Sequence, residues 1–255
     1  LTGCGKASSQ ASKSTSAKKQ PAEIQKIIDS GKLKVGVKID VPKFGYKNPK
    51  TGKIEGFEID LAKDMAKKIL GDPNKIDFEA VTAKTRGPLL DSDEVDMDIS
   101  TFTITDERKK SYNFSTPYYT DAVGLLVKKS SNIKSFKDLN GKKIGVAQSS
   151  TSKQALQDEA SKENINVSFL EFASYPEIKA ALTSGRVDCF SVDRSILYGY
   201  LDDNTRLLKD KFSPQDYGIA IKKSNTELTK LVNSTITDMK KSGQMDKLIQ
   251  KWGLK

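Results

Sequence analysis

The sequence predicts a two-lobed α/β protein in which each lobe is a mainly parallel sheet flanked by helices. Three observations support this fold class. Short apolar runs of strand length alternate with longer stretches whose apolar residues recur at helical spacing, the order typical of βαβ units. The alternation is interrupted at Tyr118 and Tyr119 and then starts again. A chain of 255 residues is also long enough for two lobes of about 100 residues each.

The first series of elements follows a short helix. Ile24, Ile27 and Ile28 fall at helical spacing, and Gly31 ends this helix before an apolar strand at 33–37. The series continues with an amphipathic helix at 58–70, a strand at 75–81, a short helix at 88–91 and a strand at 95–100.

The second series begins with an extended run. After this run at 121–128, the pattern predicts a strand at 143–147, a helix at 152–163, a strand at 166–172, a helix at 175–183, a strand at 187–192 and a helix at 195–201. A strand at 217–221 and helices at 226–241 and 245–251 close the chain. If these last helices return to the first lobe, the chain crosses between the lobes twice, and two crossings make a hinge.

We therefore divide the chain into a tether and two lobes. The tether is 1–22, because 5–22 contains Ser, Lys, Ala and Gln without a large apolar side chain. The first lobe is 23–117 with 219–255, the second is 118–218, and the crossings lie near 118–122 and 213–218.

Composition excludes several classes of site. The chain has no His, so Ser-His-Asp triads, Cys-His pairs and imidazole-based metal sites are absent. Its two cysteines, Cys4 and Cys189, do not form the dense framework of a disulfide-rich domain. No stretch reaches the roughly 18 apolar residues of a membrane span. We expect a water-soluble protein without a cofactor, a bound metal or catalytic residues.

The net charge of +10 raises the question of nucleic-acid binding. The 43 Lys and Arg residues are scattered among 33 Asp and Glu residues and do not alternate with aromatic residues. A base-stacking surface needs such interleaving. We therefore interpret the charge as a solvated basic surface and expect no nucleic-acid partner.

Some polar residues suit a free α-amino acid, whose carboxylate needs a cation and whose ammonium needs an anion. In the segment 101–108, hydroxyls alternate at the end of a predicted strand and Arg108 follows in the first turn of a helix. A cation is better placed at a helix C-terminus, so Arg108 is expected to serve a ligand. The alternative is a surface arginine paired with Asp106 or Glu107.

The second lobe offers an acid and a hydroxyl loop. Asp193 ends the apolar strand at 187–192, at the edge where α/β sheets bind ligands, although it also suits the N-cap of the next helix. Ser149, Ser150 and Thr151 follow another strand and open a helix, as in anion sites, but such residues also favour caps.

The sequence also resembles a known family. The matching segments are Thr101-Phe-Thr-Ile-Thr-Asp-Glu-Arg-Lys-Lys, Tyr112-Asn-Phe-Ser-Thr-Pro-Tyr-Tyr, Gly141-Lys-Lys-Ile-Gly-Val, Val187-Asp-Cys-Phe-Ser-Val-Asp and the terminal Lys251-Trp-Gly. In order and spacing over 23–255, they resemble the polar amino-acid substrate-binding proteins of ABC importers, solute-binding family 3. This resemblance implies a type II periplasmic-binding-protein fold with a two-strand hinge, an L-amino acid as ligand, a membrane permease as partner and a monomer.

Further segments resemble the aspartate/glutamate branch of that family. They are Gly36-Val-Lys-Ile-Asp-Val-Pro, Ala83-Lys-Thr-Arg-Gly-Pro-Leu-Leu and Phe172-Ala-Ser-Tyr-Pro-Glu-Ile. The chain departs from the family at 97–100, where relatives run smaller and more apolar, and we expect this to change packing rather than binding.

The resemblance implies a role for each of ten residues. Arg108 holds the α-carboxylate with Thr103 and a contact from Ser149, Ser150 and Thr151, Asp193 takes the ammonium with Thr101, and Arg86, Lys38 and Tyr175 hold a side-chain carboxylate. Three cations against one acid give this set a net charge of +2. Glutamine would leave a buried cation unpaired, which costs about 3–5 kcal/mol, although a bridging water reduces this to partial discrimination.

The first four residues, Leu1 to Cys4, resemble a bacterial lipobox. This implies lipidation of Cys4 and a place on the outer face of the cytoplasmic membrane, or in the periplasm of a Gram-negative cell. Three other functions stay open: binding of glutamine or of polar amino acids generally, dehydration of a cyclic acid by an enzyme of the same fold, and sensing or adhesion.

Overall fold

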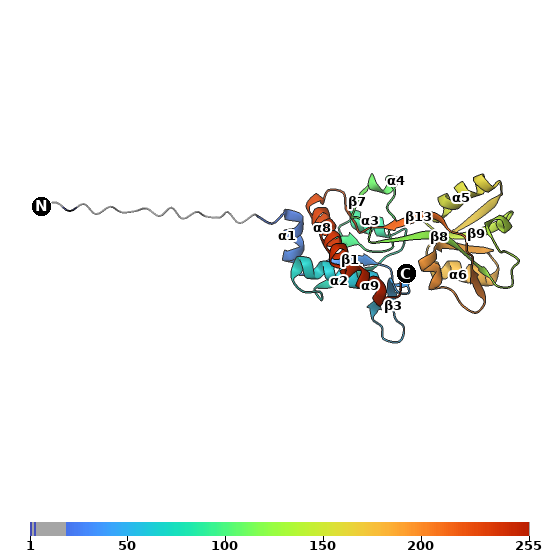
Figure 1. Ribbon diagram of the computed structural model, residues 1–255, viewed down its shortest axis with the longest axis horizontal. Helices are drawn as coiled ribbons and strands as arrows, with labels where there is room; N and C mark the ends of the chain where they lie inside the picture. The colour runs from blue at the N-terminus through green and yellow to red at the C-terminus, as the bar shows by residue number, and fades with distance from the viewer. Residues whose placement is uncertain (2, 4–18, 255) are drawn as a thin grey trace.

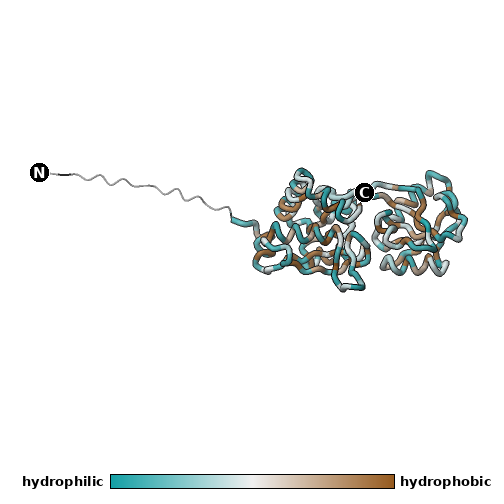
Figure 2. Tube along the Cα trace, turned by 60° about the horizontal axis from the view of Figure 1, so that its bottom comes forward, coloured by the Kyte–Doolittle hydropathy of each residue, from teal (hydrophilic) through white to brown (hydrophobic). Residues whose placement is uncertain are grey.

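The computed structural model describes residues 1, 3 and 19–254. They form two lobes, each with its own sheet and flanking helices (Figure 1). Apolar segments lie inside both lobes and hydrophilic segments form many of the outer loops (Figure 2). The predicted lipidation site Cys4 and most of the predicted tether lie outside the described residues.

The first lobe is built on a five-stranded sheet of order β5-β1-β6-β14-β7. Its strands are β1 (Leu33–Val37), β5 (Ile76–Ala80), β6 (Met97–Asp98), β7 (Tyr112–Phe114) and β14 (Ala220–Lys222). Its helices are α1 (Ala22–Ser30), α2 (Phe57–Leu70), α3 (Arg86–Asp91), α4 (Asp106–Lys109), α8 (Thr226–Ser242) and α9 (Gln244–Lys251). The closing helices therefore pack on this lobe, where α8 contacts α1 and α9 contacts α2.

A small three-stranded sheet accompanies the first lobe. It consists of β2 (Asp40–Val41), β3 (Gly45–Lys47) and β4 (Ile54–Glu55), and it packs against α2. These short strands were not predicted, because two or three residues give no measurable periodicity.

The second lobe is built on a six-stranded sheet. The order is β10-β9-β11-β8-β12, and β13 also pairs with β8. Its strands are β8 (Tyr119–Lys128), β9 (Lys142–Ala147), β10 (Val167–Phe172), β11 (Cys189–Asp193), β12 (Thr205–Leu207) and β13 (Phe212–Tyr217). Its helices are α5 (Ser152–Glu163), α6 (Tyr175–Ser184), α7 (Arg194–Tyr198) and the 3-10 turn η1 (Phe136–Leu139).

Both sheets are mixed, which corrects the expectation of mainly parallel sheets. The parallel pairs are β1 with β5 and β6, and β9 with β10 and β11, as βαβ units require. Antiparallel pairing extends each sheet, since β8 pairs with β11, β12 and β13, and β14 pairs with β6 and β7. The apolar pattern predicts where a strand lies but not the direction in which its neighbour in the sheet runs.

Most long elements lie within a few residues of their predicted positions. The main differences are a shorter strand at 95–100, of which only Met97 and Asp98 pair as β6, and a split of the strand predicted at 217–221. That strand ends as β13 at Tyr217 and resumes as β14 at Ala220, on the other sheet.

The strands β8 and β13 connect the two lobes side by side (Figure 1). Tyr119 lies opposite Tyr217 in their antiparallel pairing. The two rings are stacked with centroids 5.8 Å apart, and Phe44 meets each of them edge-on. The junction between the lobes is therefore a buried aromatic cluster.

Among residues 19–254, no helix has the length and apolarity needed to cross a membrane. Cys189 is buried in β11, and burial raises the pKa of its thiol, as expected for a packing residue.

Candidate ligand-binding site

The predicted site residues gather at the carboxyl ends of the parallel strands of both lobes. Lys38 follows β1 directly, Thr101 lies three residues after β6, Ser149 lies two residues after β9, and Asp193 is the last residue of β11. Parallel strands present their carboxyl ends at one edge, where α/β sheets bind ligands. The lobes turn these two edges toward one another, so residues more than 100 positions apart in the chain meet.

Lys38 joins the two lobes. Its side chain is 1% exposed, and its Nζ donates hydrogen bonds to Thr101 Oγ1 at 3.0 Å and to Tyr175 OH at 2.9 Å. Tyr175 begins α6 on the second lobe. Burial and the nearby positive charge of Arg86 lower the pKa of Lys38 to about 7.

Arg86 is fully enclosed at the start of α3. Its guanidinium lies 3.8 Å from the centre of the Phe102 ring and donates to the carbonyl of Ser100 at 2.8 Å. The side chain is 3% exposed, and burial lowers its pKa. Arg86 is thus turned inward, as the predicted role requires.

Arg108 spans the gap between the lobes. Its side chain donates to the carbonyl of Thr103 at 2.7 Å and to the carbonyl of Ser149 at 3.0 Å. Its backbone N–H is held by the Thr105 hydroxyl, which caps α4. Among the described residues, Arg108 forms no ion pair with Asp106 or Glu107, the two alternative partners, which pair with Lys109 and Lys110 instead.

The acid of the second lobe is Asp193. Its side chain is 4% exposed and accepts a hydrogen bond from Tyr217 OH at 2.5 Å. Burial and the nearby Asp121 raise the pKa of Asp193 to about 6, so the group is mostly ionised at pH 7. Asp193 occupies the N-cap position of α7, as the alternative from the sequence had it, but its side chain makes no capping hydrogen bond among the described residues.

The backbone is strained at two of the predicted residues. Thr101 has φ of 46° and Ser149 has φ of 63°, both in the left-handed region that side chains rarely adopt. The Thr101 N–H is held by Glu58 Oε2 at 2.7 Å, which fixes the chain after β6. The Ser149 carbonyl, in the second of these strained segments, accepts a hydrogen bond from Arg108 across the junction.

The structure brings the ten predicted residues together in two adjoining places. Thr103, Arg108, Ser149, Ser150 and Thr151 line an open cavity of about 530 Å³. Lys38 and Tyr175 line a much smaller hollow, and Arg86, Thr101 and Asp193 are buried near it. Two hydroxyls are engaged inside the protein, because Ser150 donates to the carbonyl of Ala147 and Thr151 donates to Gln215 Oε1.

Sequence reasoning missed three acids near these cations. Glu58 and Asp98 are 0% exposed, and Asp40 is half-buried. Burial raises the pKa of all three carboxyl groups, and the nearby positive charge of Lys38 partly lowers each pKa again. Glu58 in an amphipathic helix and Asp40 after a strand gave no signal, since such acids are usually solvated. Asp98 lies inside the predicted strand at 95–100, and its segment was noted only as a departure from the family.

Within the described part of the chain, these acids form no ion pair with Lys38, Arg86 or Arg108. None of the ion pairs among residues 19–254 includes Lys38, Arg86 or Arg108. The cations are held by hydroxyls, carbonyls and the Phe102 ring. Because buried charges normally pair, this arrangement is suited to an anion that enters between the lobes.

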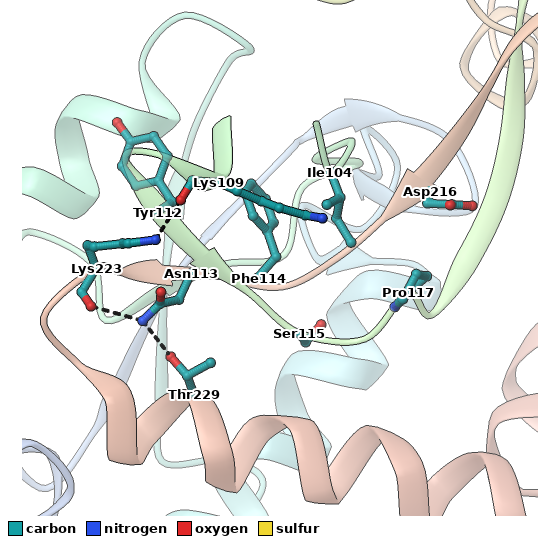
Figure 3. Close-up of a pocket in the computed structure, with 10 residues that line it drawn as sticks. All are labelled: Ile104, Lys109, Tyr112, Asn113, Phe114, Ser115, Pro117, Asp216, Lys223 and Thr229. Atoms are coloured by element: carbon teal, nitrogen blue, oxygen red, sulfur yellow. Dashed lines mark hydrogen bonds between the residues drawn. The ribbon is translucent and has the colours of Figure 1, made fainter. Parts of the chain in front are cut away.

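A second cavity contains no comparable group of unpaired cations among the described residues. It has a volume of about 510 Å³ and lies beside β7 and α8 (Figure 3). Asn113 donates to the carbonyl of Lys223 and to Thr229 Oγ1, and Lys223 Nζ donates to the carbonyl of Lys109. The side chains of Asn113, Thr229 and Lys223 already have partners in these bonds, and none of the ten predicted site residues lines this cavity.

Residues 33–255 match the family of bacterial extracellular solute-binding proteins, family 3. The chain belongs to this family. The predicted fold class is confirmed as the two-lobed type II periplasmic-binding-protein fold, here with mixed sheets.

Two relatives align with almost the whole chain. The ABC transporter glutamine-binding protein GlnH of Bacillus subtilis (strain 168) is 42% identical over 255 residues, 99% of this chain and 91% of the relative. The glutamine-binding protein of Geobacillus stearothermophilus is 44% identical over 243 residues, 92% and 91% of the two chains.

Among solved structures, an ancestral amino acid-binding protein, a precursor of cyclohexadienyl dehydratase, is 35% identical. It has a TM-score of 0.80 and covers 91% of this chain and 99% of its own. The two sequence relatives are named for glutamine, the alternative ligand considered above.

Proposed function

We propose that this protein is the amino-acid-binding component of an ABC importer and that its preferred ligand is glutamate or aspartate. One observation carries the choice of an acidic ligand: Lys38, Arg86 and Arg108 meet at the junction of the lobes without an ion-pair partner among the described residues. A ligand with two carboxylates supplies the missing counterions.

The proposed roles follow the geometry. Arg108 takes the α-carboxylate in the cavity that the Thr103 backbone and the Ser149 to Thr151 loop line. The Ser150 and Thr151 hydroxyls reach the ligand only by releasing their hydrogen bonds to Ala147 and Gln215. Asp193 takes the α-ammonium, aided by Thr101. Lys38, Tyr175 and Arg86 take the side-chain carboxylate deeper between the lobes.

The closed form of the two lobes is stabilised by hydrogen bonds between them, which an open form would not make. Lys38 bonds Tyr175, Arg108 bonds Ser149, and Tyr200 donates to the Asp40 carbonyl at 2.7 Å, each across the junction. A ligand that touches both lobes adds to these contacts in the closed form alone and shifts the population toward it. We propose that the crossings near 118–122 and 213–218 bend, that a permease recognises the closed form, and that a lipid on Cys4 keeps the protein at the membrane.

Glutamine is the second candidate. Two relatives that cover more than nine-tenths of the chain are named for it. The buried acids Glu58 and Asp98 also offset part of the positive charge that the sequence alone assigned to the site.

A ligand panel tests the proposed function. Calorimetry and thermal unfolding with the twenty L-amino acids should rank glutamate or aspartate first. A ligand at 100-fold above its Kd should raise Tm by about 5–10 °C. Recovery of the ligand unchanged by mass spectrometry separates binding from a dehydratase activity. Absence of any response contradicts the function, whereas a first rank for glutamine contradicts only the preference.

The affinity for glutamate is expected to fall above pH 7. The protonated form of Lys38 binds the carboxylate, and its pKa is about 7 here and higher once an anion lies beside it. The contribution of Lys38 to affinity is therefore complete below pH 7 and declines at higher pH, by up to tenfold per pH unit, until the pKa of the bound form is reached. Calorimetry from pH 6 to 9 measures this slope. Lys38→Met should reduce it, and an unchanged slope in that variant would contradict the role.

A further inference from the structure

Asp98 occupies a position shaped for it beneath the site. It ends β6, where it pairs with Gly36 on β1 and Ala220 on β14, and it is 0% exposed. A Cβ atom at residue 36 would lie 2.0 Å from Asp98 Oδ1. Only glycine at 36 leaves room for this carboxyl group, so the two residues form a matched pair.

The carboxyl group of Asp98 lacks a hydrogen-bond partner within the part of the chain that the structure describes. Neither of its oxygens is bonded among the described residues, and the same holds for Ser100 Oγ and Arg86 Nε. Arg86 is bonded to the Ser100 carbonyl, which ties it to the same strand segment. A buried carboxylate without partners is costly, so its charge must be neutralised by a proton or balanced by a nearby cation.

Both means of balancing the charge are present. Burial raises the pKa of Asp98 well above its usual range, while Arg86 and, to a smaller extent, Lys38 lower it. Tyr112 on β7 is a further titratable group that Asp98 influences, since the carboxyl group contributes to the raised pKa of Tyr112. Glu58 acts on the same two cations. The charge of Asp98 therefore depends on what else faces Arg86.

We propose that Asp98 is a specificity-determining residue: its carboxylate balances Arg86 when the ligand carries a neutral amide, and its protonated form leaves Arg86 to a ligand carboxylate. The inference rests on the proposed function and extends it to glutamine. The proton is exchanged with solvent, so glutamate binding takes up more protons than glutamine binding. One site thereby accepts both ligands without a lone buried cation.

The first test compares ligands in two variants. Asp98→Asn keeps the shape, and Asp98→Val removes the unpaired oxygens. Calorimetry at pH 7 with L-glutamate and L-glutamine should show that each variant favours glutamate over glutamine at least tenfold more than the parent protein does. A structural role would weaken both ligands alike. An unchanged ratio of the two Kd values in both variants overturns the proposal.

The second test counts protons. Binding enthalpies in buffers of different ionisation enthalpy give the protons taken up with each ligand. The Lys38→Met background is used because the ammonium of Lys38 also gains a proton near a carboxylate. There, glutamate should take up more protons than glutamine, and adding Asp98→Asn should abolish the difference. A difference that persists without Asp98 overturns the proposal.

Failure of the inference differs from failure of the function. If the parent protein binds glutamate or glutamine and the Asp98 variants keep its selectivity, the amino-acid-binding function stands and the role of Asp98 is wrong. If the parent protein binds no amino acid, both are wrong.

Discussion

Arg108→Ala should strongly weaken the binding of every amino acid, whatever its side chain. The α-carboxylate is common to all of them, and Arg108 is placed to take it between the Thr103 and Ser149 carbonyls. Truncating one partner of a buried, hydrogen-bonded charge pair costs about 2–5 kcal/mol, which corresponds to a loss of about 30- to several thousand-fold in affinity. Calorimetry with glutamate, aspartate and glutamine measures the loss.

Two controls accompany this variant. Arg108→Lys keeps the charge but not the planar, two-pronged donor group, so it should restore only part of the affinity. Arg186→Ala removes an exposed arginine of the second lobe that lines neither cavity, and its affinities should equal those of the parent protein. Normal binding by Arg108→Ala would contradict the central contact of the site.

Arg86→Met should weaken the binding of glutamate and aspartate much more than the binding of glutamine. Met fills much of the enclosed volume against Phe102 but supplies no charge for a side-chain carboxylate. We expect the affinity for glutamate and aspartate to fall at least 100-fold, and that for glutamine to stay within about threefold, since an unpaired buried charge costs about 3–5 kcal/mol. Competition calorimetry on the three ligands measures this contrast.

The variant leaves Asp98 without its main cation. Asp98 is then expected to stay protonated, which lowers stability without favouring either ligand. The double variant Arg86→Met/Asp98→Leu removes both charges and should recover the Tm while keeping the selectivity for glutamine. Equal losses for glutamate and glutamine in both variants would contradict the side-chain role of Arg86.

Local pattern is sufficient for much of the fold. The 3.6-residue spacing of apolar side chains placed α2, α5 and α8 within a residue or two, because each of these helices buries one face along its whole length. The short strands β2 to β4 were not predicted from the sequence, because their pairing depends on neighbouring strands rather than on their own periodicity.

The candidate site also contains residues that the sequence predicts and residues that it does not. Residues that follow parallel strands, such as Lys38 and Asp193, can be recognised because chain order fixes where strands end. The family could also be recognised from the sequence alone. The segment at 97–100 was noted as a departure from the family pattern. Its interpretation as a packing change alone gave no indication that Asp98 lies near Arg86.

The sequence by itself determined the family, the alternation of strands and helices, and the types of side chain available to a zwitterion. Only the tertiary structure decided which charges act together. Glu58 meets Thr101 and Tyr118, which are 43 and 60 positions away, and Asp98 fits against Gly36 on a neighbouring strand. Burial is a property of such distant contacts, and burial sets the pKa of each group, so the electrostatics of the site emerge only once the chain is folded.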